Sequence, residues 1–357
     1  MKKLLFLSLT IITFNSIQVK AQGIGELIKT GPADATKLLN AYADPLFKGL
    51  GTGLNGGWTN TAKTKGLLHF DVRFGVTGVF VPSNDKSFDV TQIGLNANVV
   101  MPADASKTIA PTFGGSRNTN GPTMNIYDEQ GNNVGNFVLP SGQMSVIPVP
   151  QLQATVGIIG NTDVTLRAIP KFKISNDIGS VSMIGFGIKH NIMQDLVGNM
   201  ASKVVPFDLA VAAGYTRLNY ELNLNVQPSN NAQPKDGQQS TNFSEQKLDG
   251  HFGGFNLQLV ASKNLVFFTP FIAVGYQTAK TNIDLLGNYP INTGINNIVQ
   301  RQPTYTTFSN PISVNKNSIS SFRTDLGFQL QAGFFKFYAS GSLAEYKSVT
   351  AGIGLGL

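Results

Sequence analysis

A regular alternation of apolar and polar residues between Leu67 and Leu357 is the feature that most restricts the fold of this chain. In 68–80, the apolar residues occupy mainly the even positions, and polar or charged residues lie between them. Successive side chains of a β-strand point to opposite faces, so the pattern predicts strands with one apolar face. The same pattern recurs in 163–174, 207–215, 255–261, 266–276, 322–334 and 349–357.

The length and polarity of these segments favour a closed barrel. Several segments reach roughly 10–13 residues, which is long enough for a tilted strand to cross a bilayer. Their polar face carries charged residues, Gly, Ser and Gln, as the lining of a barrel does. Alternation continues to Leu357, where closure onto the first strand would protect an exposed edge. We therefore expect an all-β fold, an antiparallel transmembrane β-barrel; the alternative is a soluble exported β-domain.

The connections give an expected strand count. Two long polar stretches, 227–246 and 282–318, are expected to be outer loops, whereas Gly160-Asn161 and Lys263-Asn264 are expected to be short periplasmic turns. This assignment predicts about 14 strands, within a range of about 12–16. The expected strands are 67–82, 87–101, 106–114, 122–128, 133–140, 150–159, 162–174, 180–190, 205–227, 247–262, 265–280, 319–334, 335–346 and 348–357.

The first residues have the layout of an export signal. Lys2 and Lys3 precede an apolar run over 4–14, and Val19-Lys20-Ala21 is a small-residue cleavage site. We therefore expect a signal peptide at 1–21 and export by a bacterium. The net charge of +7 falls to +4 when the three lysines of this segment are removed, so nothing indicates a nucleic-acid partner.

Residues 22–65 differ from the rest of the chain. Pro32 opens a segment whose apolar residues recur at helical spacing, and Pro45 is expected to kink or end this helix. A Gly-rich stretch, 49–58, follows it. We expect 22–65 to form a helical and Gly-rich plug and 66–357 to form the barrel. The candidate plug residues are Leu38, Leu39, Tyr42, Pro45, Phe47 and Trp58, which either pack into the lumen or line an apolar ligand pocket.

Composition excludes several kinds of chemistry. The chain has no Cys, so a disulfide scaffold, a thiolate metal site and a Cys nucleophile are excluded. Gly51–Gly56 matches G-x-G-x-x-G, but it follows a helical pattern instead of a strand, which disfavours a dinucleotide site. The three His residues lie far apart in the sequence, and no G-x-S-x-G occurs. We expect no enzyme activity, no cofactor and no metal.

Charged residues are scarce, at 13% against about 25% in soluble domains, so those on the polar faces of the strands are the candidate ligand or lumen residues. Either they form pairs that stabilise a solvated lumen, or they guide a substrate such as the carboxylate of an amphiphile. These residues are His69, Asp71, Arg73, Arg167, Lys171, Lys173, Arg323 and Asp325.

The arrangement of signal, N-terminal segment and strands resembles the FadL-type outer-membrane transporters of hydrophobic compounds, and a group of Bacteroidota outer-membrane proteins. The resemblance rests on PADATKLLNAYADPLFKGLGTGLNGGW, PQLQATVGIIGNTDVTLRAIPKF and PFDLAVAAGYT. It implies a location in the bacterial outer membrane and a barrel plugged by its N-terminal segment. FadL-type plugs often carry an Asn-Pro-Phe turn, where this chain has Asp44-Pro45-Leu46-Phe47. The family also uses an interrupted wall for lateral exit, which makes Pro111 a candidate for such an opening.

Two functions follow as hypotheses. The first is a plugged channel or transporter for hydrophobic or amphiphilic small molecules, with outer-membrane lipid around it. The second is a non-transporting accessory barrel of an outer-membrane secretion or assembly complex, in which 227–246 and 282–318 bind protein partners.

Overall fold

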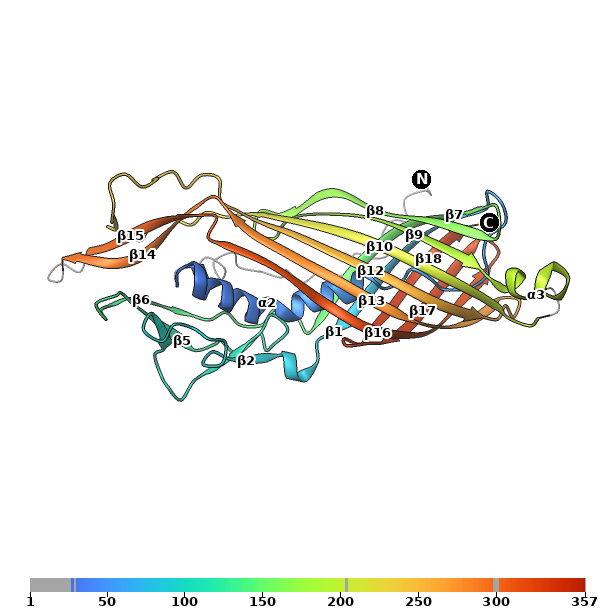
Figure 1. Cartoon of the computed structure of the whole chain (residues 1–357), viewed down its shortest axis with the longest axis horizontal. Coiled ribbons are helices and arrows are strands. Elements are labelled where there is room, and N and C mark those ends of the chain that lie inside the picture. Colours follow the sequence, from blue (N-terminus) through green and yellow to red (C-terminus); the bar gives the residue numbers. More distant parts are fainter. Residues whose placement is uncertain (1–26, 29, 203–204, 298–301, 357) are drawn as a thin grey trace, which may run out of the picture.

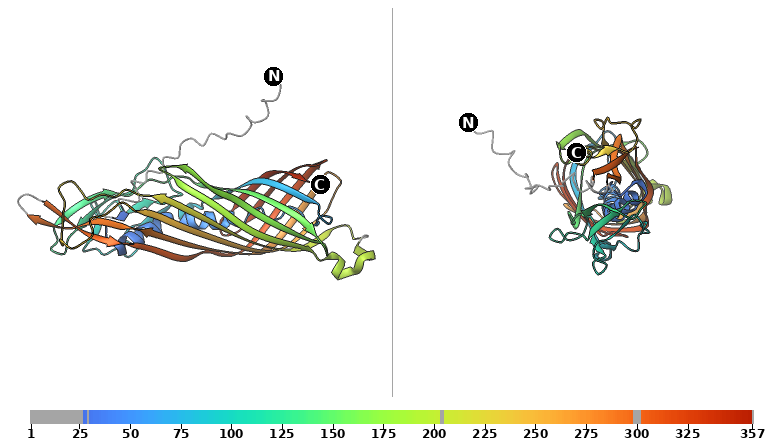
Figure 2. Two further views of the ribbon diagram at one scale, coloured as in Figure 1. Left: turned by 90° about the horizontal axis from the view of Figure 1, so that it is seen from above. Right: turned by 90° about the vertical axis from the view of Figure 1, so that its left-hand side faces the viewer.

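The computed structural model describes residues 27–28, 30–202, 205–297 and 302–356, so the expected signal peptide lies outside the described residues. Ten antiparallel strands form a closed barrel (Figures 1 and 2). Closure occurs at β1, which pairs with β7 on one side and with β18 on the other. In chain order the wall strands are β1 (Phe70–Phe80), β7 (Val146–Ile158), β8 (Thr162–Ser175), β9 (Gly179–Asn191), β10 (Asp208–Asn223), β12 (Lys247–Ser262), β13 (Phe268–Leu286), β16 (Ile312–Ala332), β17 (Phe335–Leu343) and β18 (Ser348–Gly356).

The all-β closed barrel is confirmed, but the expected count of about 14 strands, within about 12–16, is wrong, because the barrel has ten. The four expected strands between 83 and 149 do not enter the wall. They contribute short strands to two small sheets, β2 with β4 and β3 with β5 and β6. Those strands are β2 (Ser87–Asp89), β3 (Val100–Pro102), β4 (Ile109–Pro111), β5 (Thr123–Tyr127) and β6 (Asn133–Val138), next to the 3-10 helix η1 (Ser83–Asp85).

Residues 81–145, called the outer module below, have a core of their own. Val90, Met124 and Phe137 are buried together with Leu27 and Leu38 from the N-terminal part of the chain. The alternating apolar residues of this region therefore pack on that core. They are not the outward face of a barrel wall. Alternation alone does not distinguish the two cases.

The barrel has two different ends. One end, called the turn end, lies on the right in Figure 1. It carries the helix α3 (Met193–Ser202) and the connections 159–161, 263–267 and 333–334. The outer module lies at the opposite end, called the module end. There the stretch 282–318, expected to be a loop, is mostly strand. It completes β13, begins β16 and supplies a hairpin whose sheet is β11 (Gln233–Pro234), β15 (Gln302–Ser309) and β14 (Asn288–Asn297).

The helix α2 (Pro32–Leu54) lies inside the barrel, as the view along the barrel shows (Figure 2). Pro32 occupies the first turn, where its missing N–H is not needed. Pro45 is inside the helix and does not end it, because α2 continues to Leu54. Neither helix of the described residues is long and apolar enough to cross a membrane.

The inward face of the wall changes polarity along the barrel. Around α2, buried apolar side chains such as Ile147, Phe252 and Ile283 point inward and pack on the helix. Further toward the turn end, buried polar side chains such as Gln153 and Gln258 occupy the inward positions. We call these two parts the helix zone and the polar zone.

The outward face changes in the opposite sense. Around the polar zone it is apolar, and exposed Phe186, Tyr215 and Phe255 are neighbours across three strands. Beyond this aromatic row, Arg217 on β10 and Lys280 on β13 are exposed. From Phe207 to Tyr215 the outward positions stay apolar, which spans about 20 Å of height for a tilted strand. At the turn end the barrel is therefore apolar outside and polar inside. At the module end it is polar outside and apolar inside.

Candidate functional site

The interior of the polar zone is occupied by residues 55–65, called the lumen segment, which connect α2 to the start of β1. Wall side chains bind its main chain along its length. Gln153 Nε2 donates to Gly57 O at 3.0 Å, and Ser262 Oγ accepts from Ala62 N at 2.9 Å. Near the turn end, Lys189 Nζ donates to Lys63 O at 2.8 Å. The lumen segment therefore fills the polar zone as a chain that the wall binds through its main chain.

Arg167 on β8 joins the wall to the end of α2. Its guanidinium donates from Nη1 to Leu54 O at 2.8 Å and from Nη2 to Gly56 O at 2.9 Å. The last carbonyls of a helix lack intrahelical partners and carry the negative end of the helix dipole. Arg167, which is fully buried, thus caps α2 from the barrel wall. Gln153 Oε1 accepts a further hydrogen bond from Nη2, at 3.0 Å.

Trp58 is held between Arg167 and two glycines. The guanidinium carbon of Arg167 lies 4.0 Å from the ring centroid, a close cation–π contact. Gly187 on β9 and Gly214 on β10 are paired in register. A Cβ atom at Gly187 or Gly214 would lie 2.6 or 2.5 Å from indole atoms. The absence of a side chain at both positions makes the space that the indole occupies.

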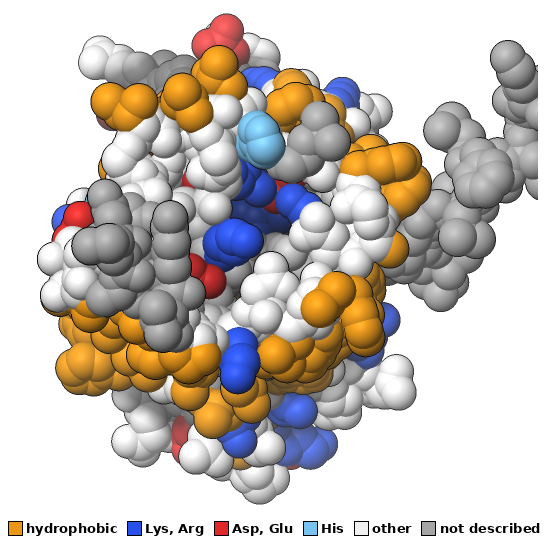
Figure 3. All heavy atoms as spheres, turned by 90° about the vertical axis from the view of Figure 1, so that its right-hand side faces the viewer, with side chains coloured by type: hydrophobic (Ala, Val, Ile, Leu, Met, Phe, Trp, Pro, Cys, Tyr) orange, Lys and Arg blue, Asp and Glu red, His pale blue; other side chains and the backbone are white. Residues whose placement is uncertain are grey.

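Arg73 and Asp71 on β1 form a second group. Arg73 Nη1 donates to Asn60 Oδ1 of the lumen segment at 2.8 Å. Asp71 accepts from Lys65 Nζ at 2.7 Å, and Lys336 Nζ lies 3.3 Å from the same carboxylate. At the turn end Figure 3 shows a hollow in which Lys and Arg side chains gather beside acidic ones.

Arg323 and Asp325 on β16 form a third group within the wall. Arg323 Nε lies 2.9 Å from both carboxylate oxygens of Asp325, and Gln258 Nε2 also donates to Asp325. Gln258 in turn accepts from Thr59 Oγ1 at 3.2 Å. This pair therefore reaches the lumen segment through one intermediate side chain.

The polar zone carries a surplus of positive charge. Its inward cations outnumber its inward carboxylates by six to four in the described residues, a net charge of +2. The cations are Lys65, Arg73, Arg167, Lys189, Arg323 and Lys336, and the carboxylates are Asp71, Asp163, Asp208 and Asp325. No cluster of three or more His, Asp or Glu suited to a metal ion occurs in the part of the chain that the structure describes.

His69, Lys171 and Lys173 are exposed and do not join the buried groups of the polar zone, so their expected place in the lumen stays a prediction. His69 is the residue before the first residue of β1, Phe70. In β8 the register with β9 shifts between Ile169 and Phe172, so the strict alternation ends there. Lys171 instead pairs at 2.6 Å with Glu221 on β10, which lies on the far side of β9.

Pro111 does not interrupt the barrel wall, so that expectation is wrong. It is buried in β4, which pairs only with β2 of the outer module. The wall strands that separate are β7 and β8, whose pairing ends toward the module end at Gln153 and Arg167.

The expected plug residues divide among three environments. Leu39 and Phe47 pack on the wall in the helix zone. Leu38 is buried in the core of the outer module, and Tyr42 donates to Ser141 O of that module at 2.9 Å. Trp58 lies in the polar zone.

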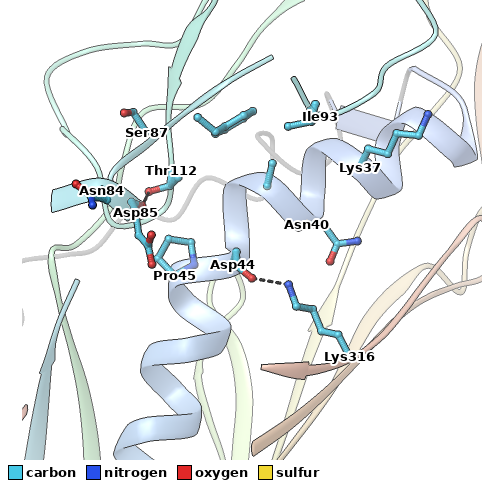
Figure 4. Close-up of a pocket in the computed structure, with 12 residues that line it drawn as sticks. Lys37, Asn40, Asp44, Pro45, Asn84, Asp85, Ser87, Ile93, Thr112 and Lys316 are labelled. Atoms are coloured by element: carbon cyan, nitrogen blue, oxygen red, sulfur yellow. Dashed lines mark hydrogen bonds and ion pairs between the residues drawn. The ribbon is translucent and has the colours of Figure 1, made fainter. Parts of the chain in front are cut away.

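Pro45 borders a cavity of about 450 Å³ between α2, the outer module and β16 (Figure 4). Asp44 next to it pairs with Lys316 of β16. Lys48 lies 3.1 Å from Asp44 and 3.7 Å from Asp85 of the outer module. These ion pairs fasten the middle of α2 to the wall and to the outer module.

The whole sequence, residues 1–357, matches the model of DUF6588, described as a family of unknown function. The chain belongs to this family. No curated protein matches it.

Among solved structures, the chain is similar to Ail, the attachment invasion locus protein of Yersinia pestis. The identity is 9%, over 82% of this chain and 98% of Ail, with a TM-score of 0.26. The translocator domain of the autotransporter NalP from Neisseria meningitidis is 9% identical, over 92% and 98% of the two chains, with a TM-score of 0.29. The toluene transporter TbuX of Ralstonia pickettii is 9% identical, over 82% and 90%, with a TM-score of 0.19. Such low TM-scores carry no argument about this chain, so the resemblance to FadL-type transporters stays a prediction.

Several residues of the site were not among the sequence candidates, notably Gln153, Lys189 and Lys336. Gln153 alternates with apolar residues in the expected strand 150–159, so its inward position could have been found from that pattern. Lys189 and Lys336 lie close to the turn end, each near one end of its strand. Only the closed barrel brings Lys189 to the lumen segment and Lys336 to Asp71.

Proposed function

We propose that this protein is a bacterial outer-membrane barrel that is closed at rest by its own N-terminal segment and opens for small molecules when that segment moves. The observation that carries the proposal is the reversal of polarity along the wall. Around the polar zone the outward face is apolar over about 20 Å and bounded by aromatic residues, as in strands that contact lipid. The interior at the same level is polar and filled by the lumen segment.

Closure by the lumen segment and α2 fits a gate. The interior of an eight-stranded barrel is about filled by side chains, whereas about 16–18 strands leave an aqueous channel. Ten strands leave room for α2 and the lumen segment, and these close the pathway. The bonds that hold the lumen segment are hydrogen bonds and ion pairs, each of modest net strength. They can be exchanged for bonds to water or to a passing solute.

The two zones suit an amphiphilic substrate. The helix zone offers apolar wall residues such as Phe252 and Ile283 once α2 shifts. The polar zone offers cationic groups such as Arg167 and Arg73. A small molecule with an apolar body and a polar or anionic head would find a complementary surface in each zone.

A disulfide lock tests the gate. A Cβ atom at Gly49 of α2 lies 3.2 Å from Cβ of Ile147 on β7, near the separation of about 3.5–4.5 Å in disulfides. The chain has no other Cys, so Gly49→Cys with Ile147→Cys forms a unique pair. In planar bilayers we expect openings in potassium chloride with the reduced protein and none with the oxidised protein. Ile147→Cys alone is the control, and it should not respond to oxidation.

Two outcomes of this experiment would count against the proposal. Equal conductance in the fully crosslinked and the reduced protein would show that α2 is not a gate. A complete lack of openings in every form would show that the barrel is not a channel.

A second function, an accessory barrel of a secretion or assembly complex, is favoured by the order of the module end. Residues 227–246 and 282–318 bind each other, for example through Gln239 Nε2, which donates to Tyr305 O at 2.9 Å. An ordered surface of this kind can bind a protein. Native purification from the membrane distinguishes the two functions, since recovery of the free barrel alone contradicts this one.

A further inference from the structure

We infer that the opened lumen selects anions, and that Arg167 is the group at which an anionic substrate binds once the lumen segment has withdrawn. This inference rests on the proposed gate, and it names the class of solute that the gate admits. The ligand chemistry is an organic anion with a carboxylate, sulfonate or phosphate group.

The charge of the polar zone is the first argument. Without Lys65, which belongs to the withdrawn lumen segment, five inward cations of the wall face four carboxylates, and the zone lies inside a wall whose outer face is apolar. Charges in such a low-dielectric environment interact more strongly than in water. The net positive charge of the wall therefore attracts anions into the lumen and repels cations.

The difference between Arg167 and the other two arginines is the second argument. Arg323 has its carboxylate partner Asp325 at 2.9 Å, and Arg73 lies 3.6 Å from Asp71. All hydrogen-bond partners of Arg167 in the described residues are neutral oxygens. Two of these oxygens are main-chain carbonyls, Leu54 O and Gly56 O.

Withdrawal of the N-terminal segment leaves Arg167 without several partners at once. It loses both carbonyls and the indole of Trp58, and it keeps only the neutral side chains of Gln153 and Thr216. A buried guanidinium without partners is unfavourable. The planar guanidinium matches a carboxylate or phosphate in a bidentate geometry, so such an anion can replace the two carbonyls.

The approach from the turn end supports the same selectivity. Lys336 of the wall lies beside Asp71, and Lys189 lies beside Asp163. Figure 3 shows Lys and Arg side chains gathered in a hollow at this end. Each of these carboxylates has a wall cation beside it. An anion that passes this hollow therefore meets positive charge before it reaches Arg167.

The test measures the reversal potential of open channels in planar bilayers under a potassium chloride gradient. We expect chloride to be more permeant than potassium in the full-length protein. Arg167→Gln should lower the chloride-to-potassium permeability ratio by roughly tenfold. Arg167→Lys keeps the charge and should retain most of the selectivity. Arg217→Gln, at an exposed position on β10 outside the lumen, is the matched control and should change nothing.

If Arg167→Gln does not fold, a second variant tests the same inference. Gln153→Glu keeps the size of the side chain and places a carboxylate beside Arg167, where Gln153 Oε1 already accepts its hydrogen bonds. We expect it to lower the permeability ratio as Arg167→Gln does. Openings that prefer potassium, or a ratio that neither variant changes, would overturn the inference while leaving the gate intact. The absence of openings in all forms would instead contradict the proposed function.

Discussion

Arg167 lies over Trp58, with 4.0 Å between the guanidinium carbon and the centroid of the indole ring. One residue belongs to the wall and the other to the lumen segment. The same guanidinium also binds the carbonyl of Leu54, so a single side chain connects the wall, the end of α2 and the lumen segment. Five changes, in this arrangement and elsewhere in the protein, have definite expected outcomes.

The Arg167→Gln variant should loosen the lumen segment. It removes a cation–π contact and two charge-assisted hydrogen bonds to main-chain carbonyls, so we expect a loss of about 2–4 kcal/mol in the free energy of unfolding. Trp58 is the sole Trp of the chain, and its emission therefore reports on the lumen segment. We expect a red shift of that emission and faster proteolysis within 55–65. If Arg217→Gln, at an exposed site, gave the same shift, the assignment would be wrong.

Adding a methyl group at Gly214 should displace Trp58. A Cβ atom there would lie 2.5 Å from the indole, which is closer than side chains pack. Overpacking of this kind is unfavourable by about 1–3 kcal/mol. Gly214→Ala should therefore lower the unfolding midpoint in denaturant and shift the Trp emission. Gly341→Ala on β17 is the control, since nothing lies within 4 Å of its added Cβ.

Asp71→Asn should destabilise the turn end of the lumen. The carboxylate lies close to Lys65 and Lys336. Its replacement by an amide removes the negative partner of both cations. We expect a loss of about 2–4 kcal/mol in the free energy of unfolding. The double variant with Lys65→Met should lose less than the sum of the two single variants. Strict additivity in that double-mutant cycle would mean that Asp71 and Lys65 do not interact.

Insertion into lipid should depend on which zone a new charge occupies. Leu259 on β12 is exposed within the apolar outer face, so Leu259→Arg should destabilise the inserted barrel by about 2–4 kcal/mol. Asn317 on β16 is exposed in the helix zone, and Asn317→Arg should have almost no effect. Folding into lipid vesicles, followed by the mobility of unheated samples in gels, measures both. Equal effects would contradict the placement of the membrane around the polar zone.

The ion pairs around Lys48 also extend to the loop between β17 and β18. Tyr346 in this loop donates from Oη to Asp85 of the outer module. Burial, together with the neighbouring Asp85 carboxylate, raises the pKa of Tyr346 well above its ordinary value. The phenol therefore remains a donor throughout the ordinary pH range.

The Tyr346→Phe variant removes this hydrogen bond and should lower the stability of the outer module by about 1–2 kcal/mol. Faster amide hydrogen exchange in 83–89 would show the change. Because the pKa of Tyr346 is raised, the difference from the natural protein should be the same between pH 6 and pH 9. A difference that disappears toward pH 9 would mean that the phenol ionises near its usual range.

The sequence by itself located the ten wall strands among the fourteen segments that it predicted as strands, because alternation is recognised within each segment. It also predicted inward positions for Asp71, Arg73, Arg167, Arg323 and Asp325, since a period of two places them opposite apolar residues. It could not separate the wall from the outer module. Segments such as 122–128 alternate as the wall strands do, and local alternation does not reveal which core a face packs on.

Only the tertiary structure decided what the inward residues contact. The partners of Arg167 are main-chain carbonyls of α2 and the lumen segment, which are more than a hundred residues away in the chain. The reversal of polarity within single strands such as β12 was likewise decided by the closed barrel. Phe252 and Gln258 share the inward face of β12, yet one meets the apolar side of α2 and the other meets the lumen segment. Alternation depends on the local geometry of a strand, whereas burial against α2, the lumen segment or lipid depends on packing between distant parts of the chain.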